Sequence, residues 1–159
     1  MSDLDTLVDG FQAAWSDHDP GAFAAVCAPD LHYEDPMTVE PLESPEALAA
    51  HAARLCQAFP DARMERTGER LGDGRFVAAP VKLLATHRGE IEDFPPTGRF
   101  VIVHAVFFCE LDEARTRLWR VRAFFDLYDA AIQLGVLPKP GSVGERAMLL
   151  LRGFGLRSK

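Results

Sequence analysis

The sequence predicts an α+β domain in which helices cover one face of a curved, mostly antiparallel sheet. Two patterns support this prediction. Apolar residues recur at helical spacing up to residue 59, and from residue 61 the period shortens to the alternation typical of strands. The chain has 159 residues, of which 48% are hydrophobic and 26% are charged. This length and composition indicate one folded domain with its own core and exclude a disordered or collagen-like chain.

The first third of the chain is expected to hold three helices and one short strand. Pro20 can begin a short helix, and Ser44 followed by Pro45 is typical of an N-cap with proline at the first helical position. Pro36 ends the strand that precedes it. The expected helices span residues 4–17, 20–27 and 45–59, and the strand spans residues 31–35.

The middle of the chain is typical of four strands joined by tight turns. The segment Gly72-Asp73-Gly74 indicates a hairpin, and residues 93–98 contain two consecutive prolines that make a rigid turn. A later helix is expected to end at Gly135, because glycine favours the conformation that closes a helix. The strands are expected at residues 62–71, 75–87, 99–111 and 116–126, and two further helices at residues 128–135 and 142–152.

The formal charge of −7 is unevenly distributed. Residues 139–159 hold five basic residues and one acidic residue, a net charge of +4, which leaves −11 on residues 1–138. A body this acidic argues against nucleic acid as a partner. We expect a domain over residues 1–138 and a basic C-terminal extension over residues 139–159. The helix of this extension is expected to dock on its own domain or across a dimer rather than on a membrane.

Several signals bear on the location of the protein. The N-terminus lacks the layout of a signal peptide, and no apolar run approaches the roughly 20 residues that span a bilayer. The three cysteines form no CxxC pair, and an odd count suits a reducing compartment. The five histidines show no metal-ligand spacing. The sequence therefore predicts a cytoplasmic protein with structural thiols and without a metal or cofactor.

Each of the last two strands has one wholly apolar face, because alternate residues of a strand share a face. On the other face, large apolar side chains stand among arginine and histidine, a mixture that solvent does not favour. We expect the apolar face to line the core or a pocket, and the mixed face to pack on a second copy of the chain. The apolar face holds Val101, Val103, Ala105, Phe107, Trp119, Val121, Ala123 and Phe125, and the mixed face holds Ile102, His104, Val106, Phe108, Arg120, Arg122, Phe124 and Asp126.

Three segments carry a family resemblance that covers about residues 4–137. Residues 32–36 (HYEDP) with residues 40–41 (EP) resemble the corresponding strand and loop of bacterial ketosteroid isomerases. Residues 86–90 (THRGE), followed by residues 94–99 (FPPTGR), resemble SnoaL-like polyketide cyclases, as does the QLG ending of residues 133–135. Both families belong to the NTF2-like superfamily. The resemblance implies a cone, in which one curved sheet and about three helices surround a deep apolar pocket, and dimerisation through the sheet.

The resemblance also implies a general base at Asp35, which matches the aspartate of the isomerase Glu-Asp-Pro strand. A carboxylate in an apolar pocket can take a proton from the carbon next to a carbonyl and return it elsewhere. Such a carboxyl is expected to titrate clearly above about 4. The alternative is that Asp35 only ends its strand by accepting hydrogen bonds from nearby backbone N–H groups.

The partners of this base are missing from the sequence. The positions of the isomerase's two oxyanion donors match Phe11 and Phe107, neither of which can donate a hydrogen bond. The acid and the histidine of the cyclases match Ala123 and Phe107. His87 is expected at the pocket rim, where it can supply the missing donor, or as a loop histidine against the proline turn. The predicted pocket is lined by Phe11, Trp15, Tyr33, Val103, Phe107, Trp119, Ala123 and Phe125.

Two functions remain open from the sequence. The first is an isomerase or cyclase that binds an apolar carbonyl compound, steroid-like or polyketide-like, and moves a proton without a cofactor. Asp35 is then the base, assisted by His87, Tyr33 or a bound water. The second is a non-catalytic module that binds a small molecule or dimerises. Asp35→Asn separates them, because it abolishes turnover in the first case and leaves binding of the ligand nearly intact.

Overall fold

The structure is a computed structural model, described here over residues 3–155. It confirms the α+β prediction and the order of the elements. The helices are α1 (Asp3–Ser16), α2 (Phe23–Val26, preceded by a short 3-10 helix at Pro20–Ala22), α3 (Pro45–Ala58), α4 (Leu127–Leu134) and α5 (Val143–Gly155). The strands are β1 (Cys27–Glu34), β2 (Arg63–Arg66), β3 (Leu71–Gly72), β4 (Phe76–Thr86), β5 (Phe100–Leu111) and β6 (Leu118–Phe125).

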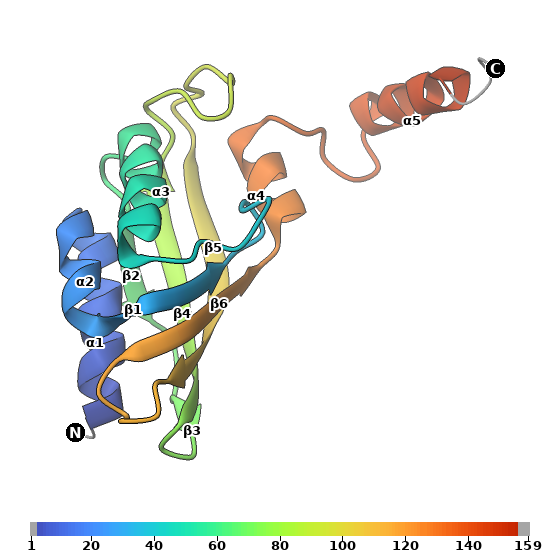
Figure 1. Cartoon of the computed structure of the whole chain (residues 1–159). Coiled ribbons are helices and arrows are strands. Elements are labelled where there is room, and N and C mark those ends of the chain that lie inside the picture. The colour runs from blue at the N-terminus through green and yellow to red at the C-terminus, as the bar shows by residue number, and fades with distance from the viewer. Residues whose placement is uncertain (1–2, 156–159) are drawn as a thin grey trace.

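The six strands form one curved sheet in the order β1-β6-β5-β4-β2, with β3 also paired to β4. The β1–β6 pair is parallel and the others are antiparallel. Helices α1, α2 and α3 lie together over one face of this sheet (Figure 1). The chain therefore has the layer of helices on one sheet face that the sequence predicted.

Local sequence signals account for the element boundaries. The hydroxyl of Ser44 accepts a hydrogen bond from the Ala47 N–H at 3.1 Å and so caps α3. Gly135 ends α4 in the left-handed conformation, with φ of 79°. The β3–β4 hairpin turns at Gly74, where φ is 89°. These three signals were predicted and are confirmed.

The strand predicted over residues 62–71 is wrong as a single element, because the structure divides it into β2 and β3. Pro80 lies opposite the break, and proline has no N–H to continue the ladder. Thr67 and Leu71 are then four positions apart, while their partners Pro80 and Ala78 are only two positions apart. The unpaired residues 68–70 form a bulge, from which the Arg70 side chain reaches α1.

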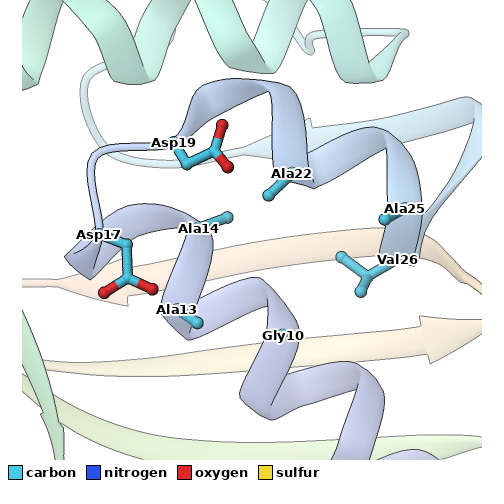
Figure 2. Close-up of a pocket in the computed structure, with 8 residues that line it drawn as sticks. All are labelled: Gly10, Ala13, Ala14, Asp17, Asp19, Ala22, Ala25 and Val26. Carbon is cyan, nitrogen blue, oxygen red and sulfur yellow. The ribbon is translucent and has the colours of Figure 1, made fainter.

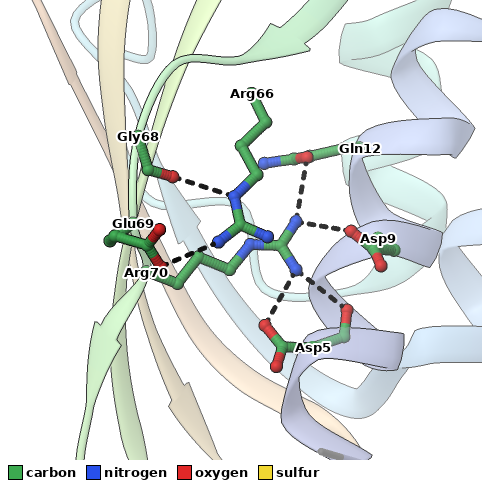
Figure 3. Close-up of polar contacts among 7 residues, drawn as sticks. All are labelled: Asp5, Asp9, Gln12, Arg66, Gly68, Glu69 and Arg70. Carbon is green, nitrogen blue, oxygen red and sulfur yellow. Dashed lines mark hydrogen bonds and ion pairs between the residues drawn. The ribbon is translucent and has the colours of Figure 1, made fainter. Parts of the chain in front are cut away.

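Arg70 ties this bulge to the first helix (Figure 3). Its guanidinium donates to the carbonyl and carboxylate of Asp5, both at 3.1 Å, to the Asp9 carboxylate at 2.5 Å and to the Gln12 side-chain oxygen at 3.2 Å. The Arg70 side chain is only 4% exposed. A buried charge needs such partners, so this cluster fixes α1 against the sheet.

Aromatic side chains fill the space between the helices and the sheet. The rings of Phe11 in α1 and Phe107 in β5 pack edge-on, with 5.3 Å between their centroids. The centroid of the Phe23 ring lies at the same distance from that of Phe11. The apolar faces predicted for the last two strands point into this core, whereas Ile102, 41% exposed, and Phe124, 56% exposed, lie on the other side. The predicted alternation is confirmed.

The C-terminal helix α5 projects away from the sheet (Figure 1). Its leucines Leu149, Leu150 and Leu151 are exposed. Among residues 3–155, no helix has the length and apolar character needed to cross a membrane. The last basic residues of the predicted extension, Arg157 and Lys159, lie outside the described residues.

Candidate functional site

Asp35 follows the end of β1, and both oxygens of its carboxylate accept hydrogen bonds. One oxygen accepts from the backbone N–H groups of Met37 at 2.7 Å and Thr38 at 3.0 Å. The other accepts from the Tyr33 hydroxyl at 2.9 Å and from His51 Nε2 at 2.7 Å. The Asp35 side chain is 3% exposed, so four donors surround a buried carboxylate.

The pKa of Asp35 is set by two opposing effects. Burial raises it, but the hydrogen bond and charge of His51, together with the hydrogen bonds from the Met37 N–H and the Tyr33 hydroxyl, outweigh burial and hold the pKa below its usual value. The pKa of Tyr33 moves well above its usual value because the hydroxyl is buried beside this carboxylate. The raised pKa expected for Asp35 is therefore not found. The backbone donors of Met37 and Thr38 agree with the alternative that the sequence left open, whereas the sequence did not reveal His51 as a donor.

His51 is the residue of this site that sequence reasoning missed. It lies on the buried face of α3 with Leu48 and Ala52, and its side chain is 7% exposed. An ionised carboxylate can only accept, so the bond to Asp35 requires the proton on Nε2. In the neutral ring, Nδ1 then carries a lone pair, and no described residue hydrogen-bonds to it. The available signal was a histidine on the apolar stripe of an amphipathic helix.

A cleft of about 320 Å³ lies beside His51. Its walls come from α3, from the segment after β1 and from the loop between β4 and β5. This volume is at the low end of the range for small-molecule sites, about 300–1,000 Å³. The lining residues are Met37, His51, Arg54, Leu55, Gln57, Glu90, Ile91, Glu92 and Asp93.

The predicted pocket residues do not line this cleft. Five of them, Phe11, Trp15, Tyr33, Phe107 and Ala123, belong to the main buried cluster and fill the interior of the fold. Val103 belongs to a second buried cluster, and Phe125 packs against that cluster. Trp119 is half-buried, and its indole N–H donates to the Asp30 carboxylate at 3.1 Å. The space expected between helices and sheet is thus occupied by side chains.

Among the described residues, His87 shares no hydrogen bond with Asp35 or His51. It is fully buried, and its ring packs against that of Phe59, with 5.4 Å between the ring centroids. Nδ1 accepts from the Thr97 N–H at 3.2 Å and lies 3.1 Å from the Thr97 hydroxyl, while Nε2 has no hydrogen-bond partner among the described residues. This geometry attaches His87 to the proline turn of residues 95–98.

A second hollow, of about 250 Å³, lies between α1 and α2 (Figure 2). Small side chains line it because Gly10, Ala13 and Ala14 of α1 face Ala22, Ala25 and Val26 across it. Of the described residues that line it, only Asp17 and Asp19 are charged. It offers a ligand neither a base nor a donor comparable with His51.

Other chemistries find little support in the described residues. No group of three or more His, Cys, Asp or Glu side chains among residues 3–155 is placed to hold a metal ion. Cys27 and Cys109 are buried, and burial raises the pKa of each thiol to about 12, so both stay protonated. Cys56 is half-buried.

Solved structures with this fold are similar over most of their length. A candidate SnoaL-like polyketide cyclase from Jannaschia sp. is 20% identical, with a TM-score of 0.74 over 86% of this chain and 93% of that chain. AclR from Streptomyces galilaeus, a candidate hydroxylase, is 22% identical, with a TM-score of 0.72 over 94% and 91%. A protein with a ketosteroid-isomerase-like fold from Catenulispora acidiphila is 16% identical, with a TM-score of 0.69 over 81% and 92%. At these identities the likeness shows the fold, and it confirms the NTF2-like expectation.

The sequence comparisons go further than the fold. No curated protein matches the chain. The family of SnoaL-like polyketide cyclases matches it over residues 5–134, which is most of its length and includes Asp35, His51 and the cleft. The chain therefore belongs to the SnoaL-like polyketide cyclase family.

Proposed function

We propose that this protein is a cofactor-free isomerase or cyclase that moves a proton on an apolar carbonyl compound through the Asp35–His51 pair. The observation that supports this most is the contact of 2.7 Å between a buried carboxylate and His51, a residue that lines a cleft and whose other nitrogen has no hydrogen-bond partner among the described residues. A base held by a carboxylate and open to a ligand is the arrangement that general base catalysis needs.

In the proposed reaction, His51 Nδ1 takes a proton from the carbon next to the substrate carbonyl. The electron pair of that C–H bond forms the enolate, and the imidazolium is stabilised by the Asp35 carboxylate. In an isomerisation, His51 returns the proton to a different carbon. In a cyclisation, the enolate carbon attacks a second carbonyl, and the resulting alkoxide takes the proton.

This proposal changes the role predicted for Asp35. A carboxylate with a lowered pKa and four donors is a weak base, so Asp35 acts as a positioning residue that orients His51. Tyr33 donates to the same carboxylate oxygen as His51 does.

The test uses a β,γ-unsaturated ketone, whose conversion to the conjugated isomer is followed by ultraviolet absorbance. We expect His51→Gln to lower kcat by at least about 100-fold, the usual share of a general base. Asp35→Asn should lower kcat as well, because the ring loses its orienting partner. His32→Gln, the same chemical change at a half-buried histidine paired with Glu34, is the control and should keep the wild-type rate. Wild-type kcat in His51→Gln would refute the proposal.

A second candidate is a binding module without turnover. It is favoured by the apolar residues Phe11, Phe107 and Ala123 at the positions where relatives carry polar groups, and by the aromatic packing of Phe11 on Phe107. In that case an apolar ketone binds to wild type and to Asp35→Asn with similar affinity, and neither protein turns it over.

We also propose that two copies of the chain pair through the outer face of the sheet. This face exposes five large apolar side chains, and it carries both signs of charge, with Arg122 paired to Glu34 and Arg75 paired to Glu110. A surface with both features can pack on its own copy across a two-fold axis. The apolar residues of the outer face are Phe100, Ile102, Val106, Phe108 and Phe124.

A further inference from the structure

The cleft beside His51 carries more acidic groups than an apolar ligand needs. The loop between β4 and β5 contributes three carboxylates, from Glu90, Glu92 and Asp93, and α3 contributes one cation, Arg54. None of these four side chains has a hydrogen bond or ion pair with another residue of the described range 3–155. The lining of the cleft therefore has an excess of two negative charges.

The loop holds these carboxylates in a defined place. The backbones of Ile91 and Phe94 exchange two hydrogen bonds, of 3.1 and 2.8 Å. Between them, Glu92 and Asp93 take left-handed conformations, with φ of 45° and 66°. Beyond this turn, the Thr97 N–H donates a hydrogen bond to Nδ1 of buried His87 and so holds the end of the loop.

The same cleft contains a polar group that points to a ligand. His51 is 95% buried, and its Nδ1 has no partner among the described residues although the ring lines the cavity. A molecule that reaches this nitrogen must occupy the space next to the loop carboxylates. A positive charge on that molecule is then attracted by Glu90, Glu92 and Asp93 and repelled by Arg54.

We propose that the cleft takes a carbonyl compound that carries an ammonium group, with the carbonyl part near His51 and the ammonium beside the carboxylates of residues 90–93. This inference rests on the proposed function for the role of His51, and it adds a cationic group to the otherwise apolar carbonyl compound proposed there. Exposed ion pairs are individually weak and are screened by salt. The selectivity should therefore be about three- to tenfold at low ionic strength and should fall as salt is added.

The test compares three ketones of nearly equal size that differ in one substituent: para-acetylbenzylamine (a cation at neutral pH), para-methylacetophenone (neutral) and para-acetylbenzoate (an anion). Their dissociation constants are measured by NMR titration at low and high salt. We expect the cation to bind about three- to tenfold tighter than the neutral ketone at low salt, and the anion to bind weakest.

Two triple variants locate the effect. Glu90→Gln/Glu92→Gln/Asp93→Asn should remove the preference for the cation, so that the cation and the neutral ketone bind with similar affinity. Glu40→Gln/Glu43→Gln/Glu46→Gln removes the same charge from exposed residues outside the cleft lining and should keep the preference. Arg54→Gln should strengthen binding of the cation further.

The outcomes are decisive in either direction. The proposal is overturned if the anion binds tightest, if the cleft variant keeps the preference, or if none of the three ketones binds. It is distinguishable from the proposed function, because His51→Gln should keep the charge preference in binding while it loses catalysed exchange of the acetyl protons in D2O. A preference for the cation without such exchange in wild type would retain the ammonium site and reject the acid–base role.

Discussion

His51 Nε2 lies 2.7 Å from the carboxylate of Asp35, and the two residues are brought together from α3 and from the end of β1. Sixteen positions separate them in the sequence. Through this contact an aspartate at the end of a strand, whose own pKa is lowered, orients a histidine that lines a cleft. The acid–base chemistry of this chain is therefore expected at the histidine, although the family resemblance points to the aspartate.

The lowered pKa of Asp35 predicts how stability depends on pH. A carboxyl with a folded-state pKa below its unfolded value of about 3.9 stabilises the fold above that value and loses this contribution as the pH falls through the folded pKa. Asp35→Asn should therefore lower the free energy of unfolding by about 2–3 kcal/mol at pH near 7, and by less at pH near 3. Urea denaturation at both values measures the difference. Asp17→Asn, at an exposed aspartate, is the control, and a difference for Asp35→Asn that does not change with pH would contradict the assignment.

The contacts of Arg70 predict that it is a structural cation. Arg70→Met removes one cationic partner from the carboxylates of Asp5 and Asp9, but these carboxylates are 33% and 51% exposed and water can reach them. We expect a loss of about 2–3 kcal/mol in the free energy of unfolding, below the usual cost of breaking a fully buried pair. Arg66→Met is the matched control. Its ion pair with Glu69 spans 3.6 Å at the surface and should contribute under about 0.5 kcal/mol. Equal losses in the two variants would contradict this role of Arg70.

Much of the fold could be predicted because its signals are local. The cap at Ser44, the left-handed Gly135 and the alternation along β5 and β6 each depend on a few neighbouring residues, and all three are confirmed. The division of β2 from β3 could not be predicted in the same way. It depends on Pro80 of the opposite strand and on the long-range contacts of Arg70 with α1.

The site was only half predictable for the same reason. Asp35 was found because it stands in a short motif that resembles a family. His51 stands in no such motif, and only the packing of α3 beside β1 brings it to the carboxylate. The pKa of Asp35 then depends both on a local backbone donor, the N–H of Met37, and on His51, which no spacing rule relates to it. The filling of the interior by Phe11, Phe23 and Phe107 depends on side-chain packing, which periodicity does not specify.

The outer face of the sheet predicts a self-association that charge should disrupt. Phe108 and Phe124 are 42% and 56% exposed, and burying them in a dimer removes apolar surface from water. We expect the wild type to sediment as a dimer and Phe108→Glu and Phe124→Glu to sediment as monomers with unchanged circular dichroism. Leu149→Glu changes an exposed leucine of α5 and should leave the dimer intact. Dimers in both phenylalanine variants would place the contact elsewhere.

The contacts of His87 separate a catalytic role from a role in holding the loop. His87→Phe keeps an aromatic ring against Phe59 and removes the acceptor for the Thr97 N–H. If His87 only holds the turn, the amide of Thr97 should exchange faster with solvent, because its hydrogen bond is lost. The stability cost should stay near 1 kcal/mol, since the unpartnered Nε2 is removed as well. The KM for an ammonium-bearing ketone should rise, because the adjoining loop carries the cleft carboxylates, while kcat stays within about threefold of wild type. A fall in kcat as large as that expected for His51→Gln, with Thr97 exchange unchanged, would instead establish His87 as the catalytic donor that the sequence predicted.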